Sequence, residues 1–305
     1  MKTANPRNMA ASVRQRLMNH ASSSREDFQV VLAQFGFERL LYRLGRLHPV
    51  PPFTVKGALL FRVWTGEQYR PTRDLDLACP GPLAAEELET IFRNACAAPV
   101  ADDGLVFEAD AVRVEPIRED TDYGGMRVSM EARLERARIP LQIDIGFGDA
   151  ITPRAVMAEF PALLDFPAPR LAVYPRETAV AEKVETMVRR GLANSRMKDY
   201  YDVWALAKTF DFDGDVLRKA LRATFRRRKT PLPDGVPDGL SDGFARDSAK
   251  QTQWTAFARR TRLKLSGADL TTVVETVRAF VAPPLAAASK PEAFRVSWRK
   301  GEPWR

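Results

Sequence analysis

The sequence predicts an α+β protein in which a mixed β-sheet is followed by a helical C-terminal half. Short segments of alternating apolar and polar residues dominate before residue 150, and such alternation is typical of strands. Beyond Pro175 apolar residues recur at helical spacing. The 305 residues, 45% of them hydrophobic, suffice for one large domain or two of ordinary size. We therefore expect an N-terminal helical segment packed on the core (1–50), the sheet-containing core (51–175), and a helical, basic C-terminal domain (176–305).

The N-terminal region is expected to hold one long helix. Its first twenty residues are polar, which predicts a frayed end. The serines at 22–24 and the acids that follow them offer an N-cap and a negatively charged first turn. Apolar residues then recur at helical spacing from Phe28 to Leu47, and the proline-rich stretch at 49–52 ends the helix.

The core region is expected to alternate between strands and helices, separated by glycine, proline and charged turns. In chain order the expected elements are a strand at 53–55, a helix at 58–64, a strand at 74–78, a helix at 83–97, strand-like alternation over 104–118, and an antiparallel pair, 125–134 and 138–147, joined by a charged turn at 135–137. In the C-terminal region we expect helices at 177–190, 198–209, 213–228, 248–264 and 269–281.

The composition limits the class of protein. No apolar run approaches the roughly 18 residues of a membrane helix, and the basic N-terminus lacks the apolar stretch of a signal peptide. Cys79 and Cys96 are the only cysteines, so we expect no disulfide framework, a cytoplasmic location and no membrane partner. The 47 Lys and Arg residues against 39 Asp and Glu give a net charge of +8, which favours an anionic partner.

Two acids in the 74–78 strand are the first site candidates. Residues two apart in a strand point to the same face, so Asp74 and Asp76 project together while Leu75 and Leu77 turn to the core. Neighbouring carboxylates repel each other unless a cation lies between them. Because the sequence has only two histidines, oxygen ligands are expected, which favours Mg²⁺, with Mn²⁺ as an alternative. A solvated acidic pair at a strand end is the competing interpretation.

A third carboxylate is expected nearby, because phosphoryl transfer commonly needs one to help activate the attacking hydroxyl. In the 138–147 strand, alternation places Asp144 on the polar face. If this strand lies beside the first, Asp144 faces Asp74 and Asp76 and serves as a third metal ligand. An acid on an edge strand is the competing interpretation, and Asp149, just past the strand, is a weaker rival.

Groups suited to phosphate flank the acidic pair. The turn at 56–58 joins a strand to a helix, and Gly57 would let backbone N–H groups approach a phosphate. Arg70 and Arg73, just before the acids, suit triphosphate oxygens. The nucleotide-binding candidates here are Lys56, Gly57, Ala58, Arg70, Thr72 and Arg73.

These motifs form an ordered series, continued by Glu177–Lys183 and by Arg196–Asp202 in the helical half. Over roughly residues 28–210 the series resembles the AbiEii/AbiGii toxin family, which belongs to the polymerase-β-like nucleotidyltransferases. The resemblance implies a nucleotidyltransferase core at 51–175 with a polymerase-β-like fold. It also implies a Mg²⁺-dependent enzyme that uses an NTP as substrate and has a cognate antitoxin protein as partner.

The resemblance further implies roles for single residues. Gly57 would line the triphosphate, Lys183 would contact phosphate, and Asp202 would complete the site from the helical half, so that the active centre would lie between the two halves. Many polymerase-β-like enzymes have Ser or Thr after the glycine, where this sequence has Ala58. The expected catalytic set is Asp74, Asp76, Asp144, Lys183 and Asp202, and Lys183, Lys198 and Asp199 join the nucleotide-binding candidates.

Without the resemblance, the residues of the helical half have simpler interpretations. Lys183 would be an exposed lysine beside the apolar stripe of its helix. Asp199 and Asp202 would belong to a surface charge network at i,i+3 spacing, which contributes only a few tenths of a kcal/mol per pair.

Positive charge concentrates at 226–229 and at 246–264 of the C-terminal region. In the second stretch six cations accompany one acid, and Trp254 and Phe257 interleave with them. Such a surface would bind an RNA backbone, with aromatic rings stacking on an unpaired end. A solvated helix face with Trp254 in the core is an equally good interpretation.

The leading hypothesis is a toxin of a toxin–antitoxin or phage-defence system that transfers a nucleotide from an NTP to RNA. Because some family members add nucleotides to the 3′ end of tRNA, that end is the expected acceptor. The alternatives are transfer to a protein or small-molecule hydroxyl, and a non-catalytic member that binds nucleic acid. The joint presence of the five candidate catalytic residues argues against a non-catalytic member.

Overall fold

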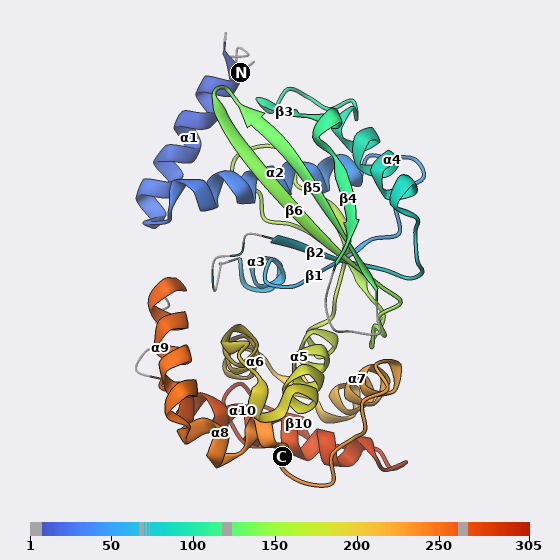
Figure 1. Cartoon of the computed structure of the whole chain (residues 1–305), viewed down its shortest axis with the longest axis vertical. Helices are drawn as coiled ribbons and strands as arrows, with labels where there is room; N and C mark the ends of the chain where they lie inside the picture. Colours follow the sequence, from blue (N-terminus) through green and yellow to red (C-terminus); the bar gives the residue numbers. More distant parts are fainter. Residues whose placement is uncertain (1–7, 67–69, 71, 73, 118–123, 262–267) are drawn as a thin grey trace. The chain divides into compact units, whose positions relative to one another are not determined.

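The computed structural model describes the chain except for residues 1–7, 67–69, 71, 73, 118–123 and 262–267. By its internal contacts the chain divides into two units, Met1–Gly148 with Val156–Val173, and Asp149–Ala155 with Tyr174–Arg305 (Figure 1). The first unit holds a mixed sheet with helices and the second is mainly helical, which confirms the predicted α+β class. No helix in the described part of the chain has the length and apolar character needed to cross a membrane.

Within the described residues, the first unit is built on one sheet of eight strands, in the order β3-β5-β6-β2-β1-β8-β7, with β4 also paired to β5. β2 runs parallel to β6 and β1 runs parallel to β8, whereas the other pairs are antiparallel. The strands are β1 (Thr54–Lys56), β2 (Asp74–Cys79), β3 (Leu105–Phe107), β4 (Arg113–Pro116), β5 (Gly125–Leu134), β6 (Ala137–Phe147), β7 (Val156–Glu159) and β8 (Arg170–Val173).

The described helices of this unit are α1 (Met9–Ser24), α2 (Phe28–Leu44), α3 (Leu60–Thr65) and α4 (Ala85–Cys96), with a short 3₁₀ turn at Ala109–Ala111. From Met9 onward, α1 overturns the prediction that the first twenty residues are frayed. Val13, Leu17 and Ala21 recur every four residues and are buried against α2 and β5. A stripe this narrow is enough to dock a helix, although the segment as a whole is polar.

The start of α2 also differs from the prediction. The N-cap is Asp27, whose carboxylate accepts hydrogen bonds from the backbone N–H groups of Gln29 and Val30. The serines at 22–24 belong to the last turn of α1 instead. One short loop therefore ends the first helix and caps the second.

α2 carries charged side chains into the interior of the first unit. Arg39 and Arg43 are 1% and 4% exposed, and both pair with Asp103, which is 2% exposed. Arg43 donates to both oxygens of this carboxylate at 2.6 and 3.0 Å, and Arg39 Nε donates to Oδ2 at 3.1 Å. The pairing offsets the cost of removing these charges from water.

The second unit holds helices close to the five that the sequence predicts, and the one expected at 248–264 is described as far as Thr261. α10 runs past its predicted end, through Pro283 and Pro284, because Val281, Leu285 and Ala288 continue its buried face. The elements are α5 (Arg176–Arg190), α6 (Met197–Thr209), β9 (Phe212–Asp213), α7 (Gly214–Arg227), α8 (Asp242–Arg246), α9 (Ser248–Thr261), α10 (Leu270–Ala288) and β10 (Ser297–Trp298), with 3₁₀ turns at Gly191–Ala193 and Asp238–Leu240.

Replacing Asp103 with Asn tests the buried charge cluster. We expect the free energy of unfolding to fall by about 3–5 kcal/mol, because Arg43 and Arg39 both lose a buried carboxylate partner and Arg39 keeps Glu38. Urea denaturation followed by circular dichroism measures the change. Asp102→Asn is the matched control, since Asp102 is exposed and Asn keeps an acceptor for the N–H of Gly104. Equal stability of the two variants would contradict this interpretation.

Candidate active site

Three predicted acids meet on one face of the sheet. β2 and β6 are parallel neighbours, and their register places Asp76 beside Asp144. Asp74, two residues earlier on β2, faces the same way. One carboxylate oxygen from each residue lies within 4.8 Å of the others, and all three residues are partly exposed. Because β6 lies between β5 and β2, the edge-strand interpretation of Asp144 is wrong.

The opposite face of the same two strands is apolar. Leu75 and Leu77 on β2 are 0% exposed, as are Ile143 and Ile145 on β6. Side chains alternate along a strand, so burial of these four residues directs the acids to the other face. A slip of one residue would move the carboxylates into the core, and the hydrophobic pattern therefore sets the geometry of the site.

Gly57 lies against the acids through strand pairing. Lys56, at the end of β1, lies opposite Asp76 in the register of the antiparallel strands β1 and β2. Gly57 follows with a left-handed φ of +78°. A Cβ atom on Gly57 would collide with the Asp76 carboxylate. Glycine is therefore required both by the backbone conformation and by the close approach. Ala58, the next residue, is 5% exposed and belongs to the core, which leaves no place there for a solvent-facing hydroxyl.

Thr72 has a direct contact with the acidic group. It is 5% exposed, and its hydroxyl donates a hydrogen bond to Oδ1 of Asp74. Its immediate partner is thus a carboxylate, which it orients. Arg70 lies partly buried in the turn before β2, and Arg73 falls outside the described residues.

Arg127 is a site residue that the sequence interpretation missed. It lies on β5 opposite Asp144, and its Nε and Nη2 atoms donate to Oδ1 and Oδ2 of that carboxylate at 2.8 and 2.9 Å. The bidentate hydrogen bond to Asp144 is the main cause of a raised pKa of Arg127, and Asp74 contributes to it. Arg127 therefore neutralises part of the negative charge of the cluster and fixes the plane of one carboxylate.

The hairpin contains the signal that would have identified Arg127. The predicted turn had three residues, 135–137, whereas the observed turn has two, and Leu134 pairs with Ala137. Glu135 adopts a φ of +53°, which this tight turn requires. Counting back along β5 and forward along β6 from this pair leads to Arg127 and Asp144. With a three-residue turn the count is displaced by one and the pairing is lost.

The donor set fits a hard divalent cation. All three acids offer oxygen ligands, which Mg²⁺ and Mn²⁺ prefer, and the spacing of their oxygens suits a single bound ion. A cation at this position would relieve the repulsion that remains among Asp74, Asp76 and Asp144 after pairing with Arg127.

Lys183, Asp199 and Asp202 form a cluster within the second unit. Lys183 on α5 pairs with Asp202 on α6 at 2.8 Å and with Asp199 at 3.3 Å, and Arg196 Nε donates to Asp199 at 2.7 Å. Burial acts to raise the pKa of Asp199, but Lys183 and Arg196 outweigh it and the pKa is lowered. Both acids are buried, so the interpretation as a surface network is wrong. Lys198 lies on α6 and is partly exposed.

Asp149, the weaker rival of Asp144, belongs to a different set of contacts. It lies in the second unit, where its Oδ2 accepts a hydrogen bond from the hydroxyl of Tyr174 at 3.0 Å. Arg228 lies 4.0 Å from its other oxygen. The acids that surround the candidate cation position in the first unit are therefore Asp74, Asp76 and Asp144.

The aromatic residues of the basic stretch at 246–264 are core residues. Trp254 is 3% exposed and Phe257 is 6% exposed, and the Phe257 ring packs edge-on against Tyr201. They are not available to stack on RNA bases. Arg259 and Arg260 are exposed on α9, whereas the last cations of this stretch, Arg262 and Lys264, lie outside the described residues.

Solved structures with a similar fold include two that match most of the chain. One is JHP933 from Helicobacter pylori, with a TM-score of 0.50 and 14% identity over 90% of this chain and 94% of that one. The other is MenT4, a nucleotidyltransferase toxin from Mycobacterium tuberculosis H37Rv, with a TM-score of 0.50 and 18% identity over 90% of this chain and 98% of that one. At these identities the similarity concerns the fold. None of the curated proteins matches the sequence.

The sequence also matches a family model, described as nucleotidyl transferase AbiEii toxin, type IV toxin–antitoxin system, over residues 39–280. The match includes both acidic clusters and Arg127, and it covers well over half of the chain. The resemblance seen in the ordered motifs is thereby confirmed. This chain belongs to the AbiEii family of nucleotidyltransferase toxins of type IV toxin–antitoxin systems.

Proposed function

We propose that this toxin transfers a nucleotide from an NTP to RNA, with the 3′ end of tRNA as the acceptor and Mg²⁺ or Mn²⁺ as the required cation. The observation that carries the proposal is the convergence of Asp74, Asp76 and Asp144 on one face of two parallel strands. Such carboxylates suit the ions that accompany phosphoryl transfer. The net charge of +8 favours a polyanionic acceptor over a small neutral molecule.

In the proposed reaction, the oxygen of a ribose hydroxyl attacks the α-phosphorus of the NTP. A new P–O bond forms as the bond to the bridging oxygen breaks, pyrophosphate leaves with the electron pair, and the hydroxyl proton is released to water. A bound divalent cation supplies stabilisation of the charge on the phosphate oxygens. The protein then contributes positioning and electrostatics, and no covalent enzyme intermediate is needed.

The residues of the first unit divide these tasks. We assign cation binding to Asp74, Asp76 and Asp144. Thr72 orients the first of these acids and Arg127 orients the third. Gly57 leaves room for the backbone to approach a phosphate, with Lys56 and Arg70 as the nearby candidates for contact with the nucleotide.

For the second unit we propose the roles that the family resemblance implies. Lys183 contacts phosphate and Asp202 holds its ammonium group. Their ion pair at 2.8 Å supports this proposal, because a fully buried carboxylate holds the ammonium group in one orientation. Asp199 shares the same lysine, and Lys198 is the remaining candidate for nucleotide contact.

The replacement Asp76→Asn tests the proposed function. Purified protein is incubated with Mg²⁺, each labelled NTP in turn and total tRNA. We expect label to enter tRNA with the native protein and to fall by about 100-fold or more with the variant, because a group that stabilises charge in the transition state is lost. Asp110→Asn removes one exposed acid from the same unit and serves as the matched control.

The acceptor is distinguished in the same reactions. Label on protein or on a small molecule, with none on tRNA, would show that the acceptor is a protein or small-molecule hydroxyl and not RNA. No label under any condition would contradict the enzymatic proposal. Growth arrest on expression that Asp76→Asn relieves, and Asp110→Asn does not, would link the reaction to toxicity.

Arg127 gives a second, independent test. We expect Arg127→Gln to lower kcat about 10-fold to 100-fold, as loss of a residue that orients a metal ligand does. The half-saturating Mg²⁺ concentration is expected to stay the same or to fall, because a positive charge has been removed beside the carboxylates. Both quantities are read from nucleotide transfer at varied Mg²⁺.

Arg127→Lys is the matched control, since it keeps the charge and lacks the planar fork that bonds both carboxylate oxygens. We expect it to restore little of kcat. Full activity of the lysine variant would show that charge alone matters, and a raised Mg²⁺ requirement in Arg127→Gln would contradict the positioning role.

A further inference from the structure

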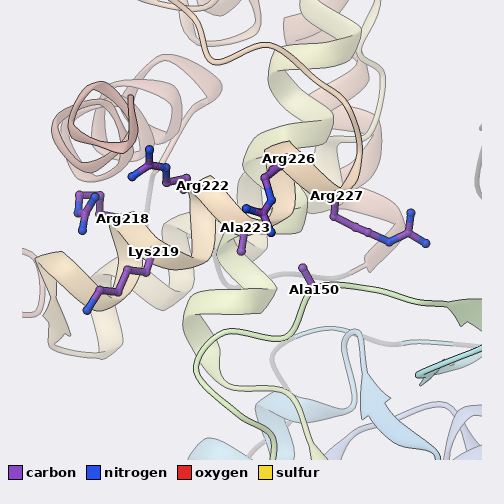
Figure 2. Close-up of a pocket in the computed structure, with 7 residues that line it drawn as sticks. All are labelled: Ala150, Arg218, Lys219, Arg222, Ala223, Arg226 and Arg227. Carbon is purple, nitrogen blue, oxygen red and sulfur yellow. The ribbon is translucent and has the colours of Figure 1, made fainter. Parts of the chain in front are cut away.

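A shallow cavity of about 470 Å³ lies on the second unit, along the exposed side of α7 (Figure 2). Its lining combines two alanines with a set of cations. Ala223 on α7 and Ala150 in the loop Asp149–Ala155 lie in its middle. The cationic side chains around them are Arg218, Lys219, Arg222, Arg226 and Arg227.

Helical periodicity explains both the hollow and its charge. Residues four apart lie on one side of a helix, so Arg218, Arg222 and Arg226 form one row. Ala223 lies between Lys219 and Arg227 in the adjacent row, and its methyl group leaves a gap between two long side chains. The hollow is thus bordered by positive charge on both rows of α7.

One acidic residue, Asp215, compensates the charge at one end of this surface. Asp215 pairs with Arg218 Nε and with Lys219 Nζ, each at 2.8 Å, and the pKa of Asp215 is lowered by these hydrogen bonds. Arg222 and Arg226 are exposed and have no ion-pair partner among the described residues. Like charges at i,i+4 spacing destabilise a helix slightly, so this arrangement favours an anion beside the third turn and the last.

The helix macrodipole accounts for only part of the pattern. Cations in the last turn are stabilised by the negative end of the helix, which explains Arg226 and Arg227. Arg222 lies outside that turn, and the loop residue Ala150 has no part in a helix-end effect. Helix stability therefore does not explain the positive charge at Arg222 or the lining of the hollow by Ala150.

Its chemistry matches a chain of phosphates. Arg218 is buried and bonded to Asp215, and three of the four exposed cations are arginines, whose planar guanidinium groups can bond two phosphate oxygens at once. Successive members of a row are about 6 Å apart along the helix axis, a spacing comparable to that of neighbouring phosphates on one strand. The large apolar residues of α7, Leu217, Leu221 and Phe225, are buried, so the face lacks the apolar anchors typical of a protein interface.

We propose that the α7 hollow binds backbone phosphates of the acceptor RNA. The proposal rests on the proposed function, since it concerns the same acceptor. The proposal places RNA binding on α7 rather than on α9, because the aromatic rings of α9, Trp254 and Phe257, are buried and cannot stack on bases. The contact is with the backbone, so it raises affinity for RNA in general and carries no preference for base sequence.

The test compares RNA binding by two double variants that remove equal charge. Arg222→Gln/Arg226→Gln removes two exposed arginines that border the hollow, and Arg259→Gln/Arg260→Gln removes two exposed arginines from α9. Glutamine is a good helix former, so both variants should fold, as circular dichroism can verify. Binding of fluorophore-labelled total tRNA is followed by anisotropy at salt concentrations from about 50 to 200 mM.

For the α7 variant we expect weaker binding at every salt concentration. The slope of log K against log salt should fall in magnitude by about 1.4 to 1.8, the value for two lost phosphate contacts. The α9 variant should retain the native slope within about half of that change. Equal losses in both variants would show that net charge alone is responsible, and a loss confined to α9 would place binding there. Either result would overturn the proposal.

Two further measurements separate this proposal from the proposed function. Label transfer from NTP to tRNA by the native protein, together with unchanged tRNA binding by the α7 variant, would overturn the hollow and leave the enzymatic function intact. No tRNA binding by the native protein would contradict both the RNA-binding role of the hollow and tRNA as the acceptor. A polyglutamate peptide is tested in the same way. If the peptide binds the native protein but not the α7 variant, and tRNA does not displace it, the hollow binds an acidic protein partner and the proposal is overturned.

Discussion

The parallel pairing of β2 with β6 is the constraint on which the candidate active site depends. Burial of Leu75 and Ile143 on one face of the sheet places Asp76 and Asp144 side by side on the other. A slip of one residue would cost the burial of these apolar side chains and place carboxylates in the core. The positions of the neighbouring site residues follow from the same register, because Gly57 has room only for a backbone beside Asp76 and the hairpin sets a guanidinium opposite Asp144.

Buried charge is handled the same way in both units, by pairing. In the second unit Lys183 is held by Asp202, and Arg228 lies against Glu182 and Glu185 of α5. Burial acts to lower the pKa of Arg228, but these carboxylates outweigh it and the pKa is raised. Breaking such pairs is costly, whereas their net contribution to stability is small. On the α7 surface, by contrast, Arg222 and Arg226 are exposed and have no ion-pair partner among the described residues.

Alternation along two strands was enough to predict the acidic group, because the pattern of a half-buried strand directs its polar side chains. The guanidinium that pairs with Asp144 was missed, since Arg127 follows only from the exact length of the turn at Glu135. The helix at Met9–Ser24 was missed because its apolar stripe is one residue wide. The environment of Trp254 was left open, since an amphipathic sequence does not state which neighbour covers its apolar face. In the structure α9 contacts α6, α8 and α10, and Trp254 is buried.

Cation binding tests most directly whether Asp74, Asp76 and Asp144 act as one site. Titration with Mn²⁺, with the free ion followed by electron paramagnetic resonance, measures affinity without any reaction. The shared site predicts that the native protein and Asp110→Asn bind alike, and that Asp144→Asn binds about tenfold more weakly or worse. Equal affinity of the native protein and Asp144→Asn would contradict a site in which the register of β2 and β6 brings the three carboxylates to one ion.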